Sequence, residues 1–181
     1  MTDTKRIIAF PRSGSHMIRG ILSVLKGEMV VVEHDYYLEH RYTGVAYVNR
    51  NPIDVTYSRH VAEKAFNWDE KWIKELFAHV HAHRQWYLSN SEIIVDYNSL
   101  AAEIETGSPR EWLKLSDFCG IKTDLEGWTN VFAENSKEKN IEKLGVLESP
   151  WFNDMMLSKE YVLKRKEFFE KFGSLWRGDE A

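Results

Sequence analysis

The sequence predicts a single α/β domain, built on a parallel β-sheet with helices on both faces. Short apolar segments alternate with segments whose apolar residues recur at helical spacing, a pattern typical of parallel strands connected by helices. The length of 181 residues suits one domain with its own core. With 43% hydrophobic and 13% aromatic residues, the composition is that of a globular protein.

Two predicted strands flank the first predicted helix. Residues 5–10 (KRIIAF) and 28–33 (EMVVVE) are short apolar segments and are predicted to be buried strands. Residues 16–26 between them are predicted to be a helix, with Gly27 as a natural stop. One helix face collects its apolar residues: Met17, Ile18, Ile21, Leu22 and Leu25.

The third and fourth predicted strands are residues 44–50 (GVAYVNR) and 92–97 (EIIVDY). A helix should follow the third strand, because Asn51 is a favourable N-cap and Pro52 would occupy the first helical position.

Three more helices are predicted. Asn67 and Glu70 have capping-box spacing at the start of one, and Ser108 and Glu111 repeat that spacing at the start of another. Beyond about residue 122 the pattern weakens, and residues 159–172 are the clear remaining helix. Its apolar side consists of Phe168, Phe169 and Phe172.

Composition narrows the functional classes. The net charge of −4 provides no global basic field for nucleic acid or an anionic membrane. Cys119 is the only cysteine, which excludes an intrachain disulfide and favours a reducing compartment. With no signal peptide and no apolar run of about 20 residues, we expect a cytoplasmic protein without a membrane partner.

Polar residues follow each predicted strand. Residues 11–15 follow the first strand, His34 and Asp35 follow the second, Arg50 ends the third and Tyr97 ends the fourth. In open parallel sheets these strand ends meet at one edge, where ligands bind. We therefore expect a binding site there.

The first of these loops predicts an anion site. It precedes a helix, whose N-terminal N–H groups favour negative charge, and Gly14 permits close backbone approach. Ser13, Ser15 and His16 add donors, and Arg12 adds a permanent cation. The alternative is an ordinary strand–helix turn with a solvated arginine. The loop is P-loop-like but lacks the Gly-Lys-Ser/Thr of a Walker A sequence, which counts against an ordinary ATP or GTP user.

A second phosphate clamp is predicted in YVNRNPIDVTYS. Arg50 ends a strand and Ser58 lies eight residues later, nearly two turns into the following helix. A helix that folds back beside its strand can bring the hydroxyl near the guanidinium, and together they suit a phosphate. The alternative is a strand end with a good helix cap.

Together these segments resemble sulfotransferases that use 3′-phosphoadenosine 5′-phosphosulfate (PAPS). FPRSGS resembles their 5′-phosphosulfate loop, and YVNRNPIDVTYS resembles their 3′-phosphate motif. IIVDYNSL is similar to the strand with an adenine-contacting tyrosine, and WLKLSDFCGI to the next helix. The resemblance covers about residues 6–121 and implies a compact sulfotransferase of one domain, residues 1–181. Residues 1–121 would be its nucleotide-binding core and 122–181 a helical C-terminal part.

The resemblance also implies residue roles. His34 would be the catalytic base, and Arg12 would touch the bridging oxygen and the transferring sulfuryl group. The other residues that would bind the nucleotide are Ser13, Gly14, Ser15 and His16 at the 5′-phosphosulfate, Arg50 and Ser58 at the 3′-phosphate, and Met17 and Tyr97 near adenine.

Several positions depart from the family pattern. Cytosolic members have lysine in place of Arg12 and Glu33, and tryptophan in place of Met17. The C-terminal R-K-G-x-x-G segment is absent, and the basic residues 164–166 are poor substitutes for it. The chain is also short, and the missing part is mostly acceptor-binding wall.

The implied reaction needs no metal. A histidine such as His34 suits proton removal from a hydroxyl or amine acceptor, and Arg12 suits the charge on the leaving nucleotide, 3′,5′-adenosine bisphosphate (PAP). The acceptor could be a small molecule, a glycan or a protein. A homo-oligomer in which a neighbouring chain completes the site is left open.

Two other functions compete with this one: a small P-loop-like nucleoside or nucleotide kinase, and a nucleotide-binding module without activity. The sequence H-x-H-x-H at residues 79–83 lies in a helical pattern, which favours a helix over a metal site. Tyr36, Tyr37 and Tyr42 would line an acceptor pocket or pack as loop aromatics.

Overall fold

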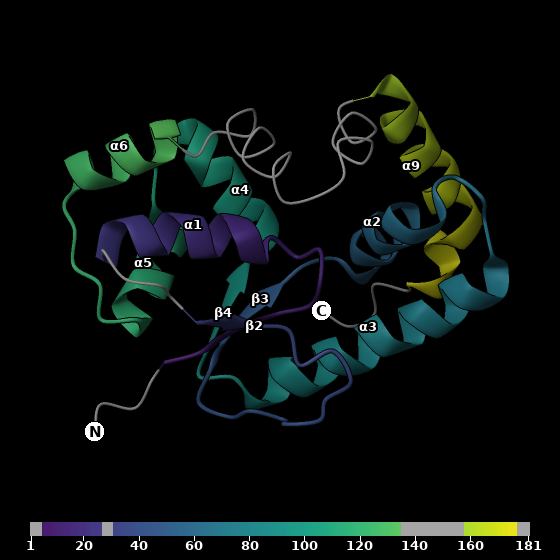
Figure 1. Cartoon of the computed structure of the whole chain (residues 1–181), viewed down its shortest axis with the longest axis horizontal. Helices are drawn as coiled ribbons and strands as arrows, with labels where there is room; N and C mark the ends of the chain where they lie inside the picture. The colour runs from purple at the N-terminus through teal and green to yellow at the C-terminus, as the bar shows by residue number, and fades with distance from the viewer. Residues whose placement is uncertain (1–4, 27–30, 135–157, 177–181) are drawn as a thin grey trace.

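The computed structural model describes residues 5–26, 31–134 and 158–176 (Figure 1). The elements in chain order are β1 (Ile7–Ala9), α1 (Ser15–Lys26), β2 (Val32–Glu33), β3 (Ala46–Asn49), α2 (Pro52–Lys64), α3 (Glu70–Asn90), β4 (Ile93–Asp96), α4 (Tyr97–Thr106), α5 (Arg110–Phe118), α6 (Leu125–Glu134), α9 (Lys159–Phe172) and a 3-10 turn (Gly173–Leu175).

The four strands form a parallel sheet in the order β2-β1-β3-β4. Ile7 of β1 is paired with Val32 on one side and Ala46 on the other, and Val48 of β3 is paired with Val95 of β4. Because every strand runs the same way, all four carboxyl ends lie at one edge. The parallel α/β prediction is confirmed.

Helices cover both faces of the sheet (Figure 1). Ile7 and Ala9 of β1 join a core with apolar residues of α1, α4, α5 and α6. Ile8 and Phe10 point to the opposite face, where they meet residues of α2 and α3. The alternation follows from the two-residue period of a strand, and a strand with both faces covered is continuously apolar.

Helix α9 packs against α2 and α3 through aromatic side chains. Phe168 and Phe172 are 0% and 4% exposed and share a cluster with Ile53, Tyr57 and Val61 of α2. Burying a phenylalanine side chain is worth roughly 1.5–3 kcal/mol, so this cluster fixes α9 firmly beside α2 (Figure 1).

The predicted N-caps have mixed outcomes. Asn51 is confirmed, since its Oδ1 accepts a hydrogen bond from the Ile53 N–H at 2.9 Å. The capping box at Asn67 is wrong, because α3 begins later and Asp69 caps it through a 3.0 Å hydrogen bond from the Trp72 N–H.

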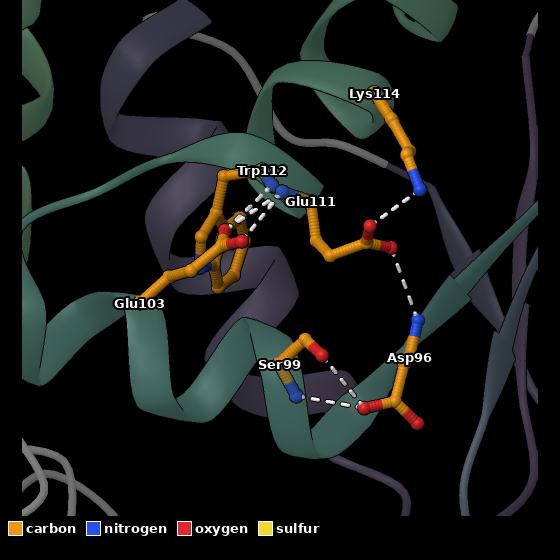
Figure 2. Close-up of polar contacts among 6 residues, drawn as sticks. All are labelled: Asp96, Ser99, Glu103, Glu111, Trp112 and Lys114. Carbon is orange, nitrogen blue, oxygen red and sulfur yellow. Dashed lines mark hydrogen bonds and ion pairs between the residues drawn. The ribbon is translucent and has the colours of Figure 1, made fainter.

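The capping box at Ser108 is also wrong, because Pro109 is the N-cap of α5 and provides no side-chain acceptor. Figure 2 shows the acceptor that takes its place. Glu103 of α4 supplies the acceptor: both its carboxylate oxygens lie 2.8 Å from the Glu111 nitrogen, and one lies 3.2 Å from that of Trp112. Glu103 is 9% exposed, and its negative charge is stabilised by the positive N-terminus of α5.

Helices α4 and α6 were not predicted, and α4 changes the setting of Tyr97. The Asp96 carboxylate accepts a 2.8 Å hydrogen bond from the Ser99 N–H and so caps α4 (Figure 2). Tyr97 is therefore the first residue of a helix and not the last of a strand. Gly27 and residues 28–30, the first half of the predicted second strand, lie outside the described residues.

Candidate functional site

A tight turn connects β1 to α1. The Ser13 N–H donates to the Phe10 carbonyl at 2.9 Å, and both Arg12 and Gly14 have positive φ angles, of 73° and 84°. A non-glycine residue in this region costs about 1–3 kcal/mol and persists where the surrounding structure enforces it. Helix α1 begins at Ser15, so its free N–H groups start directly at the turn.

Tyr97 packs directly on this turn. A Cβ atom added at Gly14 would lie 2.4 Å from the Tyr97 Cε2 atom and 3.5 Å from the Met17 Cε atom. No real Cβ contact is that short, so only glycine allows the ring to approach this closely. The segments that follow β1 and β4 are thus in contact, although β3 lies between these two strands in the sheet.

Arg50, which follows β3, joins the same group. Its Nη1 donates to the carbonyl of Arg12, and its guanidinium carbon lies 4.4 Å from the centre of the Tyr97 ring. The Nε atom is buried and has no hydrogen-bond partner among the described residues. A buried donor without an acceptor is costly, and this one lies where an anion would satisfy it.

Ser58 of α2 is 3% exposed and forms a hydrogen bond with the side chain of Tyr161, on α9. Arg50 and Arg12 also act electrostatically on the Tyr161 hydroxyl. Ser58 and both arginines therefore interact with the same Tyr161 hydroxyl. That Ser58 and Arg50 bind one phosphate stays a prediction. No pattern in the sequence indicated Tyr161.

The three consecutive cations of α9 are all engaged in ion pairs. The distances are 2.8 Å for Lys164–Glu167, 2.6 Å for Arg165–Asp54 and 4.0 Å for Lys166–Glu170. The Arg165 pair connects α9 to α2, close to Ser58 in sequence. Arg165 therefore helps to hold α9 against α2, whereas the pairs of Lys164 and Lys166 lie within α9 itself.

His34 lies directly after β2, and its Nδ1 is 2.7 Å from the carbonyl of Ala9 at the end of β1. A carbonyl only accepts, so Nδ1 carries the proton and the neutral ring has its lone pair on Nε2. Burial lowers the pKa of His34, the Ala9 hydrogen bond opposes this, and the positive groups of His16, Arg19 and Arg59 lower it further. The ring is therefore suited to accept a proton near neutral pH.

Side chains of helix α3 form hydrogen bonds with the loop that carries His34. His83 is fully buried, and its Nε2 donates to the His34 carbonyl at 3.0 Å. The Tyr87 hydroxyl donates to Asp35, which also accepts from the His40 and Arg41 N–H groups at 3.1 and 3.0 Å. The sequence analysis identified H-x-H-x-H as helical but missed this role for His83.

A hollow of about 340 Å³ opens beside His34. It is lined by residues 33–37, 39 and 40, including Tyr36 and Tyr37. Tyr36 also packs on Phe10, with 5.0 Å between ring centres. The hollow is therefore adjacent to both the candidate base and the β1–α1 turn.

The other predicted site residues lie on or beside the turn. Ser13 and Ser15 are 1% and 6% exposed, His16 is exposed, and Met17 is half-buried against the core. All ten predicted site residues thus come from the carboxyl edge of the sheet or the helices that start there.

The residues that the structure describes contain no group of three or more His, Cys, Asp or Glu side chains arranged to hold a metal ion. None of their helices is long and apolar enough to cross a membrane.

No protein-family model matches the sequence, and no curated protein matches it. Among solved structures, mouse sulfotransferase SULT7A1 in complex with PAP matches with a TM-score of 0.50 and 14% sequence identity. The fold is sulfotransferase-like. The match covers 77% of this chain and 66% of the mouse chain, just under two thirds of it. At this identity the likeness concerns the fold alone.

Proposed function

We propose that the protein is a sulfotransferase that uses PAPS and transfers a sulfuryl group to a hydroxyl or amine. The observation that carries the proposal is the contact of Arg50 with both the β1–α1 turn and the Tyr97 ring, with Nε buried and without an acceptor in the described part of the chain. Two anion-binding segments about forty residues apart therefore adjoin one aromatic ring, as an adenosine ligand with two phosphates requires.

The residues present fit such a ligand. The turn offers N–H groups and the Arg12 cation for a 5′-phosphosulfate, and Arg50 with Ser58 offers charge-assisted and neutral donors for a 3′-phosphate. The face of Tyr97 suits an adenine ring. PAPS would supply the activated sulfuryl group.

The protein's own groups have distinct tasks in this reaction. Nε2 of His34 removes the proton from the acceptor, while Nδ1 remains bonded to the Ala9 carbonyl and keeps the ring oriented. The fixed donors of the turn bind the negative charge that grows on the leaving phosphate, and such preorganised donors are typically worth about 3–4 kcal/mol each. The hollow beside His34 would hold the acceptor, whether a small molecule, a glycan or a protein side chain.

Calorimetry with PAP and with ATP tests the nucleotide assignment. We expect PAP to bind, ATP to bind much more weakly, and Arg50→Ala to weaken PAP binding at least tenfold, because loss of a charge-assisted partner costs about 1.5–3 kcal/mol. Arg110→Ala is the control, since Arg110 is an exposed arginine on α5. Preference for ATP with Mg²⁺ would instead support the kinase.

Transfer of labelled sulfate from PAPS to a panel of phenols, amines, sugars and tyrosyl peptides tests the reaction itself. We expect a labelled product with at least one acceptor class. Binding of PAP without transfer to any of them would favour a nucleotide-binding module.

A further inference from the structure

Helix α9 is held against α2 at three points near the proposed phosphate clamp. Arg165 forms an ion pair with Asp54, with Nε and Nη2 at 2.8 and 2.6 Å from Oδ1. The Tyr57 hydroxyl donates to the Tyr161 carbonyl at 2.6 Å. Phe168 is completely buried between the helices. These contacts hold α9 against α2, the helix that carries Ser58.

This docking brings the side chain of Tyr161 to the clamp. Its ring lies 4.9 Å from that of Tyr57, and its hydroxyl bonds with Ser58 within the field of Arg50 and Arg12. The unmatched Nε of Arg50 and the Ser58 hydroxyl suit an anion here, and the carboxylate of Asp54, which also acts on Tyr161, is paired with Arg165. A phenol hydroxyl beside two arginines and a serine is a further donor for the same anion.

We propose that the Tyr161 hydroxyl is a third ligand of the 3′-phosphate, supplied by α9. This inference rests on the proposed function and adds a residue to its nucleotide site. The hydroxyl donates to a phosphate oxygen, while Ser58 and Arg50 bind the remaining oxygens. Helix α9 would thereby supply a contact that the missing R-K-G-x-x-G segment provides in the resembling family.

The protonation state suits this role. Burial raises the pKa of Tyr161, and the bond with Ser58 and the charges of Arg50 and Arg12 only partly oppose this. The phenol therefore keeps its proton at neutral pH and can donate it in a hydrogen bond. An ionised phenolate would repel the phosphate.

Tyr161→Phe tests the proposal, because it removes only the hydroxyl. The affinities for PAP and for adenosine 5′-monophosphate, which lacks the 3′-phosphate, should be measured for wild type and variant by calorimetry. We expect PAP to bind about tenfold more weakly to the variant, the size of one hydrogen bond to a charged group. Adenosine 5′-monophosphate should bind both proteins equally.

Tyr42→Phe is the control, since it makes the same change away from α9, and it should bind both nucleotides as wild type does. Unchanged PAP binding in Tyr161→Phe would overturn the inference. An equal loss for both nucleotides would also overturn it, because it would indicate a purely structural role. If the wild type itself does not prefer PAP over adenosine 5′-monophosphate, the proposed function fails as well.

Discussion

Two buried histidines should make the protein less stable in weak acid. His83 and His60 are both 0% exposed, and burial lowers the pKa of each to about 4. In the unfolded chain a histidine has a pKa of about 6.5. Between these values the unfolded state binds protons that the folded state does not, so the free energy of unfolding falls as the pH falls.

The size of this loss follows from the two pKa values. At pH 5, a shift from about 6.5 to about 4 removes about 2 kcal/mol per histidine relative to pH 7. The two residues together should remove about 4 kcal/mol, a large share of the roughly 5–15 kcal/mol that stabilises a typical domain. His83 donates a hydrogen bond to the backbone of His34. Protonation of His83 would therefore disturb the segment that carries the candidate base.

Urea unfolding at pH 7 and pH 5 measures the effect. His83→Gln keeps a side-chain donor but does not titrate, so the stability lost between the two pH values should shrink by about 2 kcal/mol relative to wild type. His60→Gln should reduce this pH-dependent loss of stability by the same amount, and the double variant should reduce it by about 4 kcal/mol. His79→Gln, on the exposed side of α3, is the control. An unchanged pH dependence in His83→Gln and His60→Gln would refute the reasoning.

Two further predictions concern the candidate functional site. His34→Ala should lower kcat about 10²–10⁴-fold and leave PAP affinity unchanged, because it removes only the base; full activity with the true acceptor would show that another group takes the proton. Gly14→Ala should weaken PAP binding and lower the melting temperature, because its Cβ would meet the Tyr97 ring at 2.4 Å with φ at 84°. A PAP affinity equal to that of the wild type would contradict this, since it would mean that the ring moves freely away from the turn.

Sequence patterns predicted the strands and helices whose formation depends on neighbouring residues in the chain. The periodicity of apolar residues was enough to predict the strands and the helices α1 and α3. The parallel topology then places the carboxyl ends of strands that are distant in sequence at one edge. The two capping boxes failed because spacing along the chain does not reveal competing acceptors. Asp69 lies closer to the start of α3 than Asn67, and Glu103 reaches α5 from another helix.

Some residues of the candidate site were likewise predictable from sequence patterns, and one was not. Arg12, Gly14, Arg50 and Tyr97 were identified because they occur in segments with recognisable chemistry, and the structure brings them into contact. Tyr161 could not be found, because its place beside Ser58 depends on the docking of α9 through Phe168 and Arg165. A tyrosine in an amphipathic helix carries no signal of that tertiary contact.

A crystal structure of the protein with PAP would test the central claim most directly. We expect the 3′-phosphate on Arg50 and Ser58, the 5′-phosphate over the N–H groups of residues 14–16, and adenine near Tyr97, in one continuous ligand. Density for the nucleotide elsewhere, or phosphates that contact only one of the two segments, would contradict the claim.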